Sequence, residues 1–151
     1  KVNLTTGRSN LILDCETMDG NPKDSNLYEG VLERVRSDYG IRPRDMVSDG
    51  AYASLRNQEK AKEYGMVNIV FNKIVGSLKN VVQSVHIETR LKKWRSGMEA
   101  VISNVKRGFN LFRCDWKGRE HFDAKVLWSV IAYNIRVMTS FMLGKLMLQP
   151  Q

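Results

Sequence analysis

A strand, helix, strand unit in the first half of the chain constrains the fold more than any other feature. Residues 45–48 predict a short strand, residues 55–64 a polar helix that Gly65 ends, and residues 66–71 a continuous apolar strand. Because a helical crossover joins the two strands, they are expected to pair in parallel. Ligands gather beyond the carboxyl ends of strands in such sheets, and there the first strand delivers Asp49.

The elements on either side of this unit follow from turn residues and hydrophobic spacing. Residues 1–6 and 11–18 predict a β-hairpin. A helix is expected over residues 26–39, with Asp24 or Ser25 as its cap. Residues 72–90 give little signal and indicate an irregular connection.

Two long helices are expected in the second half, over residues 91–109 and 123–146. The latter is apolar on most of its circumference and should be substantially buried. The loop 112–119 between them mixes aromatic and basic side chains, which can stack on bases or anchor the loop to the core.

The helix expected over residues 91–109 carries charged side chains on the border of its apolar stripe. At 100° per residue, Arg95, Glu99 and Lys106 fall within about 40° of one another, beside the apolar arc. A helix that needs charge only for solubility turns it away from the core, so this border is where a site would be built. The alternative is that Glu99 is a solvated partner of Arg95, because such i,i+4 pairs are common on exposed helices.

Positive charge is concentrated around this helix. The chain has a net charge of +8, and residues 88–107 hold six cations against two carboxylates, which is half of that excess. Neutralised phosphates release counterions, so the cluster favours a polyanionic partner. A soluble basic surface is the alternative. The six cations are Arg90, Lys92, Lys93, Arg95, Lys106 and Arg107.

Length, cysteine content and hydropathy narrow the class of protein. The 151 residues are enough for one domain. Cys15 and Cys114 are too few and too far apart for a disulfide framework, and they fit a reducing compartment. Residues 126–148 are rich in apolar side chains, but Arg136 and Lys145 interrupt them, which favours a core helix over a membrane span.

The spacing Arg-x3-Glu-x6-Lys at Arg95, Glu99 and Lys106, preceded by the Asp-Gly-Ala-Tyr turn at Asp49, resembles a known signature. It is similar to the C-terminal signature of DDE transposases, the bacterial insertion-sequence enzymes with a ribonuclease H-like fold. The resemblance is to their broad IS4/IS5/IS1182-like group. The family's tyrosine, three positions before the arginine, is replaced here by Lys92, so its role is not carried over. Further matching pieces, in the same order, are residues 19–25, 102–109 and 132–134.

The resemblance implies an α/β fold, a ribonuclease H-like mixed sheet flanked by helices. It also implies a two-metal phosphoryl transfer enzyme that cuts and joins transposon-end DNA, with Mg²⁺ or Mn²⁺ as cofactor. Asp49 matches the family's second aspartate and Glu99 its glutamate, so both are expected to be catalytic metal ligands. Arg95 and Lys106 are expected to approach the DNA backbone. The outer phosphate contacts would be Arg107, Lys92 and Lys93.

The family's first aspartate lies on a central strand before the hairpin, whereas Lys1 already begins the hairpin here. We therefore expect the first strand to lie upstream and to be missing. The 151 residues would then be one N-terminally truncated catalytic domain that binds divalent metal weakly and does not cleave DNA alone. Asp14 is a substitute candidate ligand, beside Glu16 on a strand face that should be half exposed and solvated.

Three functions stay open from the sequence. The first is a transposase catalytic domain acting on double-stranded DNA, at transposon ends and at a target. The second is a non-catalytic DNA-binding remnant of such an enzyme. The third is another ribonuclease H-like nuclease, which cuts Holliday junctions or RNA–DNA hybrids. The resemblance also implies the prokaryotic cytosol, next to the nucleoid, with no membrane partner and with a homodimer on paired DNA ends as one option.

Overall fold

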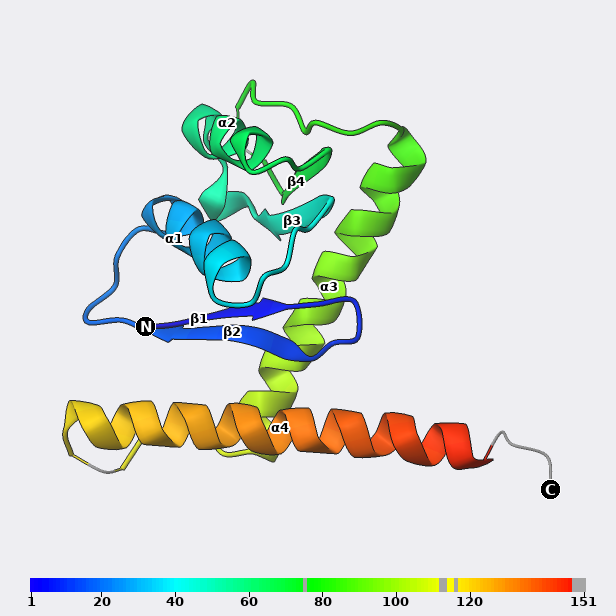
Figure 1. The fold of residues 1–151 in the computed structure, drawn as a ribbon. Coiled ribbons are helices and arrows are strands. Elements are labelled where there is room, and N and C mark those ends of the chain that lie inside the picture. Colours follow the sequence, from blue (N-terminus) through cyan, green and yellow to red (C-terminus); the bar gives the residue numbers. More distant parts are fainter. Residues whose placement is uncertain (75, 112–113, 116, 148–151) are drawn as a thin grey trace. The chain divides into compact units, whose positions relative to one another are not determined.

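The computed structural model of the chain describes residues 1–74, 76–111, 114–115 and 117–147, with side chains up to Gly144. Its elements are mixed α/β, as expected. In chain order they are β1 (Val2–Thr6), β2 (Ile12–Thr17), α1 (Asp24–Ser37), β3 (Asp45–Asp49), the 3₁₀ turn η1 (Gly50–Tyr52), α2 (Leu55–Glu63), β4 (Asn68–Asn72), α3 (Val85–Gly108) and α4 (Arg119–Met147) (Figure 1).

The described strands form two separate two-stranded sheets. β1 and β2 pair antiparallel, and β3 and β4 pair in parallel, so the hairpin and the parallel pair are both confirmed. The sequence predicts a single mixed sheet, and the structure differs because no described strand hydrogen-bonds to both β1 and β3.

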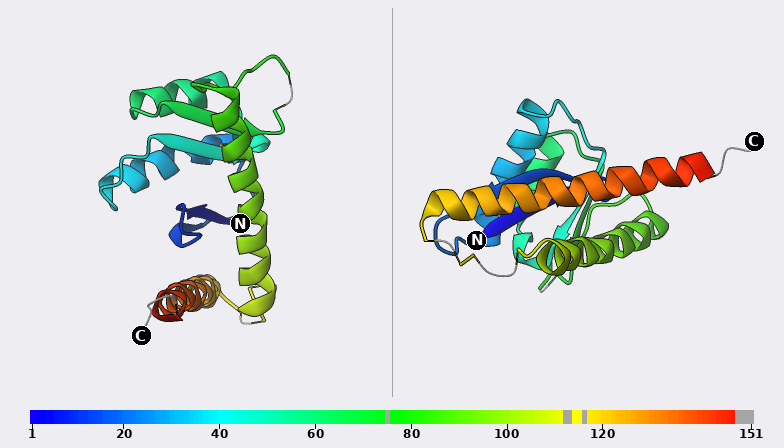
Figure 2. Two further views of the ribbon diagram at one scale, coloured as in Figure 1. Left: turned by 90° about the vertical axis from the view of Figure 1, so that its right-hand side faces the viewer. Right: turned by 90° about the horizontal axis from the view of Figure 1, so that it is seen from below.

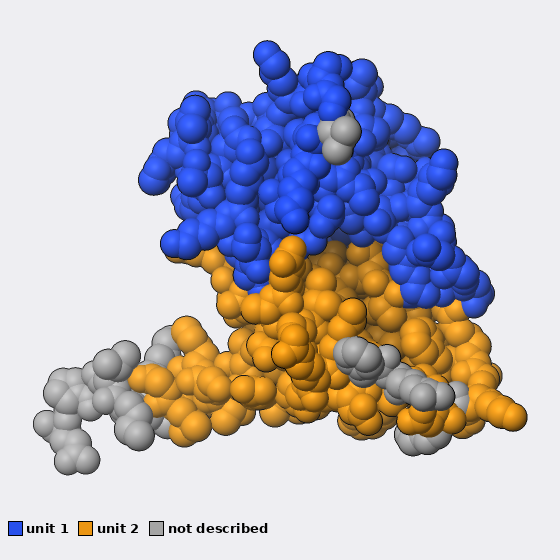
Figure 3. All heavy atoms as spheres, turned by 180° about the vertical axis from the view of Figure 1, so that it is seen from behind, with its two compact units in different colours: residues 1, 18–97 blue, residues 2–17, 98–151 orange. Residues whose placement is uncertain are grey.

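The chain divides into two compact units, and the boundary falls within α3 (Figure 3). Unit 1 comprises Lys1 and Met18–Gly97, and unit 2 comprises Val2–Thr17 and Met98–Gln151. Unit 1 contains the β3–β4 sheet and unit 2 the β1–β2 sheet. Each unit has a hydrophobic core of its own.

The core of unit 1 lies between α1, α2 and the β3–β4 pair. α1 places Tyr28 and Leu32 one helical turn apart, and both are buried. The Tyr28 ring lies 5.7 Å from the ring of Phe71 on β4, in a tilted arrangement. Ala61 of α2 and Ile69 of β4 complete the contact. This packing fixes the strand that carries Asp49.

Three helices begin earlier than expected: α1, α3 and also α4, which begins at Arg119 instead of residue 123. α1 follows Lys23, whose side chain makes no cap hydrogen bond, so the prediction that Asp24 or Ser25 is the cap is wrong. Asp24 lies in the first turn instead, where its negative charge interacts favourably with the positive end of the helix dipole. α3 begins at Val85, within the segment expected to be irregular. The Ser84 hydroxyl accepts the Ile87 amide at 3.3 Å, and this local cap explains the earlier start.

Unit 2 packs the hairpin against α4 (Figure 2). Ile12 on β2 joins Val130 and Tyr133 of α4 in the core. The Asn134 side chain bonds both backbone groups of Ile12: its Oδ1 accepts the amide at 2.9 Å, and its Nδ2 donates to the carbonyl at 2.9 Å. One side chain therefore fixes the first residue of β2 on the helix.

The prediction that the last helix is substantially buried is wrong. Val126, Val130 and Tyr133 are buried, whereas Trp128 is 70% exposed. The helix is apolar around most of its circumference, and unit 2 covers only one side of it. By length and composition alone, Arg119–Gly144 could cross a membrane, with a hydropathy of 1.4 and 22% of that window buried. The expectation of no membrane partner stays a prediction.

Candidate functional site at the end of strand β3

Asp49 is the last residue of β3, as the sequence predicts, and it pairs in register with Asn72, the last residue of β4. Its Oδ1 accepts the Ala51 amide at 3.3 Å and so caps the turn η1. Asp49 thus serves its own turn, the common structural role of an aspartate before glycine. Its other carboxylate oxygen, Oδ2, points to a different partner.

Gly50 is required by the close approach of two backbone segments. A Cβ atom at this position would lie 2.5 Å from the Lys73 carbonyl oxygen and 2.6 Å from the Asn72 carbonyl oxygen. Both neighbours are backbone atoms at the end of β4, so they cannot give way as a flexible side chain could. The glycine therefore lets the chain turn directly after Asp49 and keeps that carboxylate at the carboxyl edge of the β3–β4 pair.

The partner of Asp49 Oδ2 is Arg95 on α3. Arg95 Nη2 donates to it at 2.8 Å, the length of a strong charge-assisted hydrogen bond. The arginine side chain is only 13% exposed, whereas that of Asp49 is 48% exposed. Arg95 Nη1 is buried and has no hydrogen-bond partner among the described residues. The guanidinium is therefore buried but incompletely satisfied, beside an acid that solvent can reach.

A second ion pair joins the same helix to the same strand. Arg90 Nη2 lies 3.3 Å from Asp45 Oδ2, at the first residue of β3. Here the exposure is reversed, with the arginine 60% and the aspartate 23% exposed. The part of α3 within unit 1 is thus held along β3 by one pair at each end of the strand.

The two lysines predicted as outer phosphate contacts differ in their surroundings. Both are exposed, but Lys92 Nζ lies 2.7 Å from Glu88 Oε1 one turn earlier in the helix. A hydrogen bond from Lys92 and, with a smaller effect, one from Asn80 hold the pKa of Glu88 below its usual range. A DNA phosphate would have to compete with Glu88 for Lys92.

The remaining predicted residues on α3, Glu99, Lys106 and Arg107, are exposed and belong to unit 2. Asp49 belongs to unit 1, so the approach of the two acids stays a prediction. Lys106 and Arg107 occupy the last turn of α3, where cations also offset the partial negative charge of the helix end.

Asp14 differs from its expected environment. It lies on β2 opposite Thr5 and is 5% exposed, so the expectation of a half-exposed, solvated face is wrong at this residue. The reason is that its face of the strand packs inside unit 2, together with Ile12. Burial first, and the Asp14 charge second, raise the pKa of the neighbouring Cys15 thiol to about 11.

A family model described as "Transposase DDE domain" matches residues 1–135. The chain belongs to this family. The match runs from the hairpin through both Asp49 and Glu99 to Ile135 in α4. No curated protein and no solved structure matches the chain significantly. Family membership gives a transposase function and a nuclease type of enzyme, and DDE transposases generally use divalent metal ions.

The divalent ions of the DDE family need several oxygen ligands close together. No group of three or more His, Cys, Asp or Glu side chains that could hold a metal occurs in the part of the chain that the structure describes. Asp49 is suitable by chemistry and exposure, but Arg95 occupies its Oδ2. With Arg95 in this position, the described residues do not form a two-cation site.

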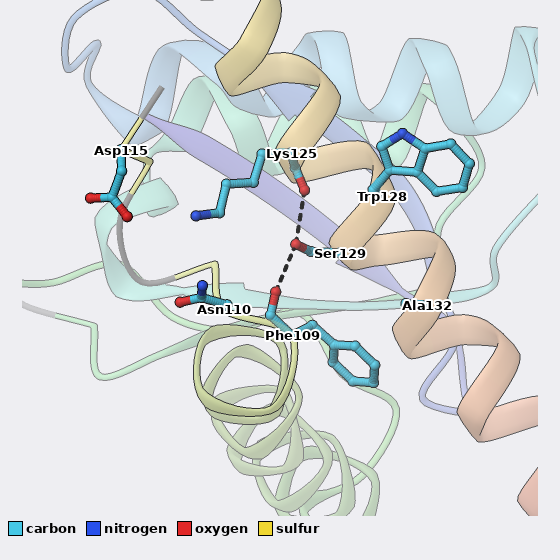
Figure 4. Close-up of a pocket in the computed structure, with 7 residues that line it drawn as sticks. All are labelled: Phe109, Asn110, Asp115, Lys125, Trp128, Ser129 and Ala132. Atoms are coloured by element: carbon cyan, nitrogen blue, oxygen red, sulfur yellow. Dashed lines mark hydrogen bonds between the residues drawn. The ribbon is translucent and has the colours of Figure 1, made fainter. Parts of the chain in front are cut away.

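The DDE domain also contains a pocket of about 450 Å³ in unit 2 (Figure 4). Ser129, one of the lining residues, lies within hydrogen-bonding distance of the carbonyls of Phe109 (3.0 Å) and Lys125 (2.8 Å). The residues that line the pocket include none of the predicted site residues. The loop of residues 112–119, which mixes basic and aromatic side chains, is only partly described, because Phe112, Arg113 and Trp116 lie outside the described residues. The predicted DNA-binding role of this loop is therefore untested.

Proposed function

We propose that the chain is the catalytic core of a DNA transposase, which cuts and joins transposon-end DNA by metal-dependent phosphoryl transfer. The observation that carries the proposal is the placement of Asp49 at the carboxyl end of β3, accessible to solvent and beside an arginine of the long basic helix. This is the edge at which open α/β sheets bind ligands. The family match supports the same conclusion.

In this proposal Asp49 and Glu99 are the acids that bind Mg²⁺ or Mn²⁺. When bound, such ions activate the attacking oxygen and stabilise the leaving oxygen. Arg95 and Lys106 hold the DNA backbone by its phosphates, and Arg107, Lys92 and Lys93 make weaker outer contacts. The substrate is double-stranded DNA in the prokaryotic cytosol, and pairing of two transposon ends would bring two copies of the protein together.

The two strand pairings support a ribonuclease H-like arrangement of the IS4/IS5/IS1182-like kind. An antiparallel hairpin followed by a parallel pair with a helical crossover is the order that this fold requires after its first strand. We propose that the β1–β2 and β3–β4 sheets are parts of one such sheet in the active enzyme.

The test is excision of a marked donor element from a plasmid by the natural gene product. Asp49→Asn and Glu99→Gln remove one metal-binding charge each and should lower excision by at least about 100-fold. Glu59→Gln is the matched control, since Glu59 is an exposed acid on α2, outside the proposed site. It should leave excision within about twofold. Full excision by either of the first two variants would rule out the catalytic proposal.

A second candidate function is a DNA-binding remnant without catalysis. It is favoured by the Arg95–Asp49 pair and by the lack of a three-ligand group among the described residues. The same experiment separates the two candidates. A wild-type protein that binds duplex DNA but supports no excision would establish the remnant instead of the enzyme.

A further inference from the structure

The helix α4 has two apolar faces, and unit 2 covers only one of them. The buried face holds Val130 and Tyr133, which form a core with Ile12 of β2. At 100° per residue, the exposed Trp128 and Ile135 point to nearly the opposite side of the helix. The exposed large apolar side chains among the described residues of α4 are Leu127, Trp128, Ile131, Ile135, Met138, Phe141, Met142 and Leu143.

The central exposed side chains repeat at the spacing of a coiled-coil seam. Intervals of three, four, three and four residues separate Trp128, Ile131, Ile135, Met138 and Met142, which we name the α4 seam. A repeat of about 3.5 residues keeps one narrow apolar stripe facing a neighbouring helix over several turns. The sequence alone shows apolar residues around most of α4. Once the structure separates the exposed residues from the buried ones, the spacing of the exposed set favours a second helix as its cover.

The area of this surface fits the interface of a stable dimer. The exposed fractions of the eight side chains range from 45% to 70%. With about 150–200 Å² for each large side chain when fully exposed, they amount together to about 700–900 Å². A stable protein interface buries about 800 Å² per partner, whereas a monomer rarely exposes an apolar patch larger than a few hundred Å².

We propose that two copies of the chain dimerise through the α4 seam, so that each seam buries the other. Because both partners use the same surface, the contact closes at two copies. Such a dimer assigns a surface to the pairing of two copies in the proposed function, and it needs neither DNA nor a metal ion.

A second copy fits this surface better than a lipid bilayer does. The other side of α4 is attached to the β1–β2 hairpin, where the Asn134 side chain hydrogen-bonds both backbone groups of Ile12. If α4 crossed a membrane, the hairpin would enter the hydrocarbon with it. The described hairpin is a two-stranded sheet with open edges, and unpaired backbone groups at such edges are not tolerated there.

Paired charge variants test the seam in solution. Ile131 and Ile135 are both exposed and lie in the middle of the seam. One double variant carries Ile131→Glu with Ile135→Glu, and the other carries Ile131→Lys with Ile135→Lys. Whichever way the two helices run, like charges meet in each variant alone and opposite charges meet in a mixture. The control, Leu55→Glu with Val85→Glu, also exchanges two exposed apolar side chains for acids, at the starts of α2 and α3.

Sedimentation equilibrium of the 151-residue protein gives the mass over a concentration series, and circular dichroism shows whether each variant folds. We expect the wild-type protein and the control to reach twice the mass of one chain. The acidic and the basic variant should each dimerise at least about 100-fold more weakly, because a charge is buried beside its like. An equimolar mixture of the two should recover the dimer.

Four results in this series would overturn the proposal: a wild-type protein that stays monomeric, a wild-type mass that grows without a limit at two copies, a control that loses the dimer as the charge variants do, or a mixture that recovers nothing. Vesicles of neutral phosphatidylcholine are the second probe. Co-sedimentation of a monomeric wild-type protein with them would assign the face to lipid instead. The catalytic proposal stays separate, because excision by Asp49→Asn and Glu99→Gln tests residues outside the seam.

Discussion

At the scale of single residues, Asn134 shows how a short motif acts far from any chemistry. Tyr133 and Asn134 both reach the end of the hairpin: the tyrosine hydroxyl donates to the Asn10 carbonyl at 3.2 Å, and the Asn134 amide bonds both backbone groups of Ile12. The Ala-Tyr-Asn piece that resembles the transposase family therefore has a structural explanation, because it attaches α4 to the start of β2.

We predict that Asn134→Ala lowers the free energy of unfolding by about 1–3 kcal/mol, since the amide and carbonyl of Ile12 both lose a partner. Urea unfolding followed by circular dichroism measures the change. Asn104→Ala is the control, because Asn104 is an exposed asparagine of α3 and the change in helix propensity is the same. That variant should show no loss, and equal behaviour of both variants would mean that the Ile12 contacts do not stabilise the fold.

The position of Asp49 could be predicted from sequence, but the partner of Arg95 could not. Asp49 follows from local signals, namely a strand, a glycine turn and a helical crossover. Arg95 lies 46 residues further along the chain, and the sequence suggested Glu99 as its neighbour through the i,i+4 spacing. Its contact with Asp49 depends on how α3 packs within unit 1, and no local pattern encodes that.

At the scale of elements, α3 combines a structural part and a basic part. Arg90, Lys92 and Arg95 all have carboxylate partners in unit 1, whereas Lys93, Lys106 and Arg107 are exposed and form no ion pair with a described residue. The latter three are the ones that can bind phosphate without breaking an ion pair with a described residue. The sequence places all six cations in one cluster and does not distinguish these two groups.

We predict that Lys106→Ala and Arg107→Ala each weaken binding to duplex DNA of any sequence. Each should also reduce the slope of log affinity against log salt concentration by about 0.9, the effect of one phosphate contact. Fluorescence anisotropy at several salt concentrations gives the slope. Lys62→Ala removes the same charge from an exposed position on α2 and should leave the slope unchanged. If all three variants behave alike, α3 is not the DNA-binding helix.

Element boundaries and burial were predicted with unequal success. The hairpin and the parallel pair follow from patterns within each strand and its turn, and both are confirmed. The sequence does carry a signal for the start of α3, because Ser84 can cap a helix and Glu88 follows in its first turn. The expectation of an irregular connection over residues 72–90 does not take that signal into account. The exposure of α4 had none, because an apolar helix does not specify what covers it.

At the scale of the whole molecule, the family assignment and the site geometry have different support. The family model spans residues 1–135 and so covers unit 1 and most of unit 2. The contacts around Asp49 lie within unit 1, whereas Glu99 lies in unit 2. In the proposed function, these two acids bind the same pair of cations.

Paramagnetic broadening tests this claim directly. Mn²⁺ is titrated into the ¹⁵N-labelled chain with duplex DNA present, and the amides of Gly50 and Ala100 report the two acids. We predict that both signals broaden with one dissociation constant, and that either Asp49→Asn or Glu99→Gln removes both effects, since the ions lie only about 3.5–4 Å apart. Broadening at one amide alone, or at both with independent constants, would contradict the shared site.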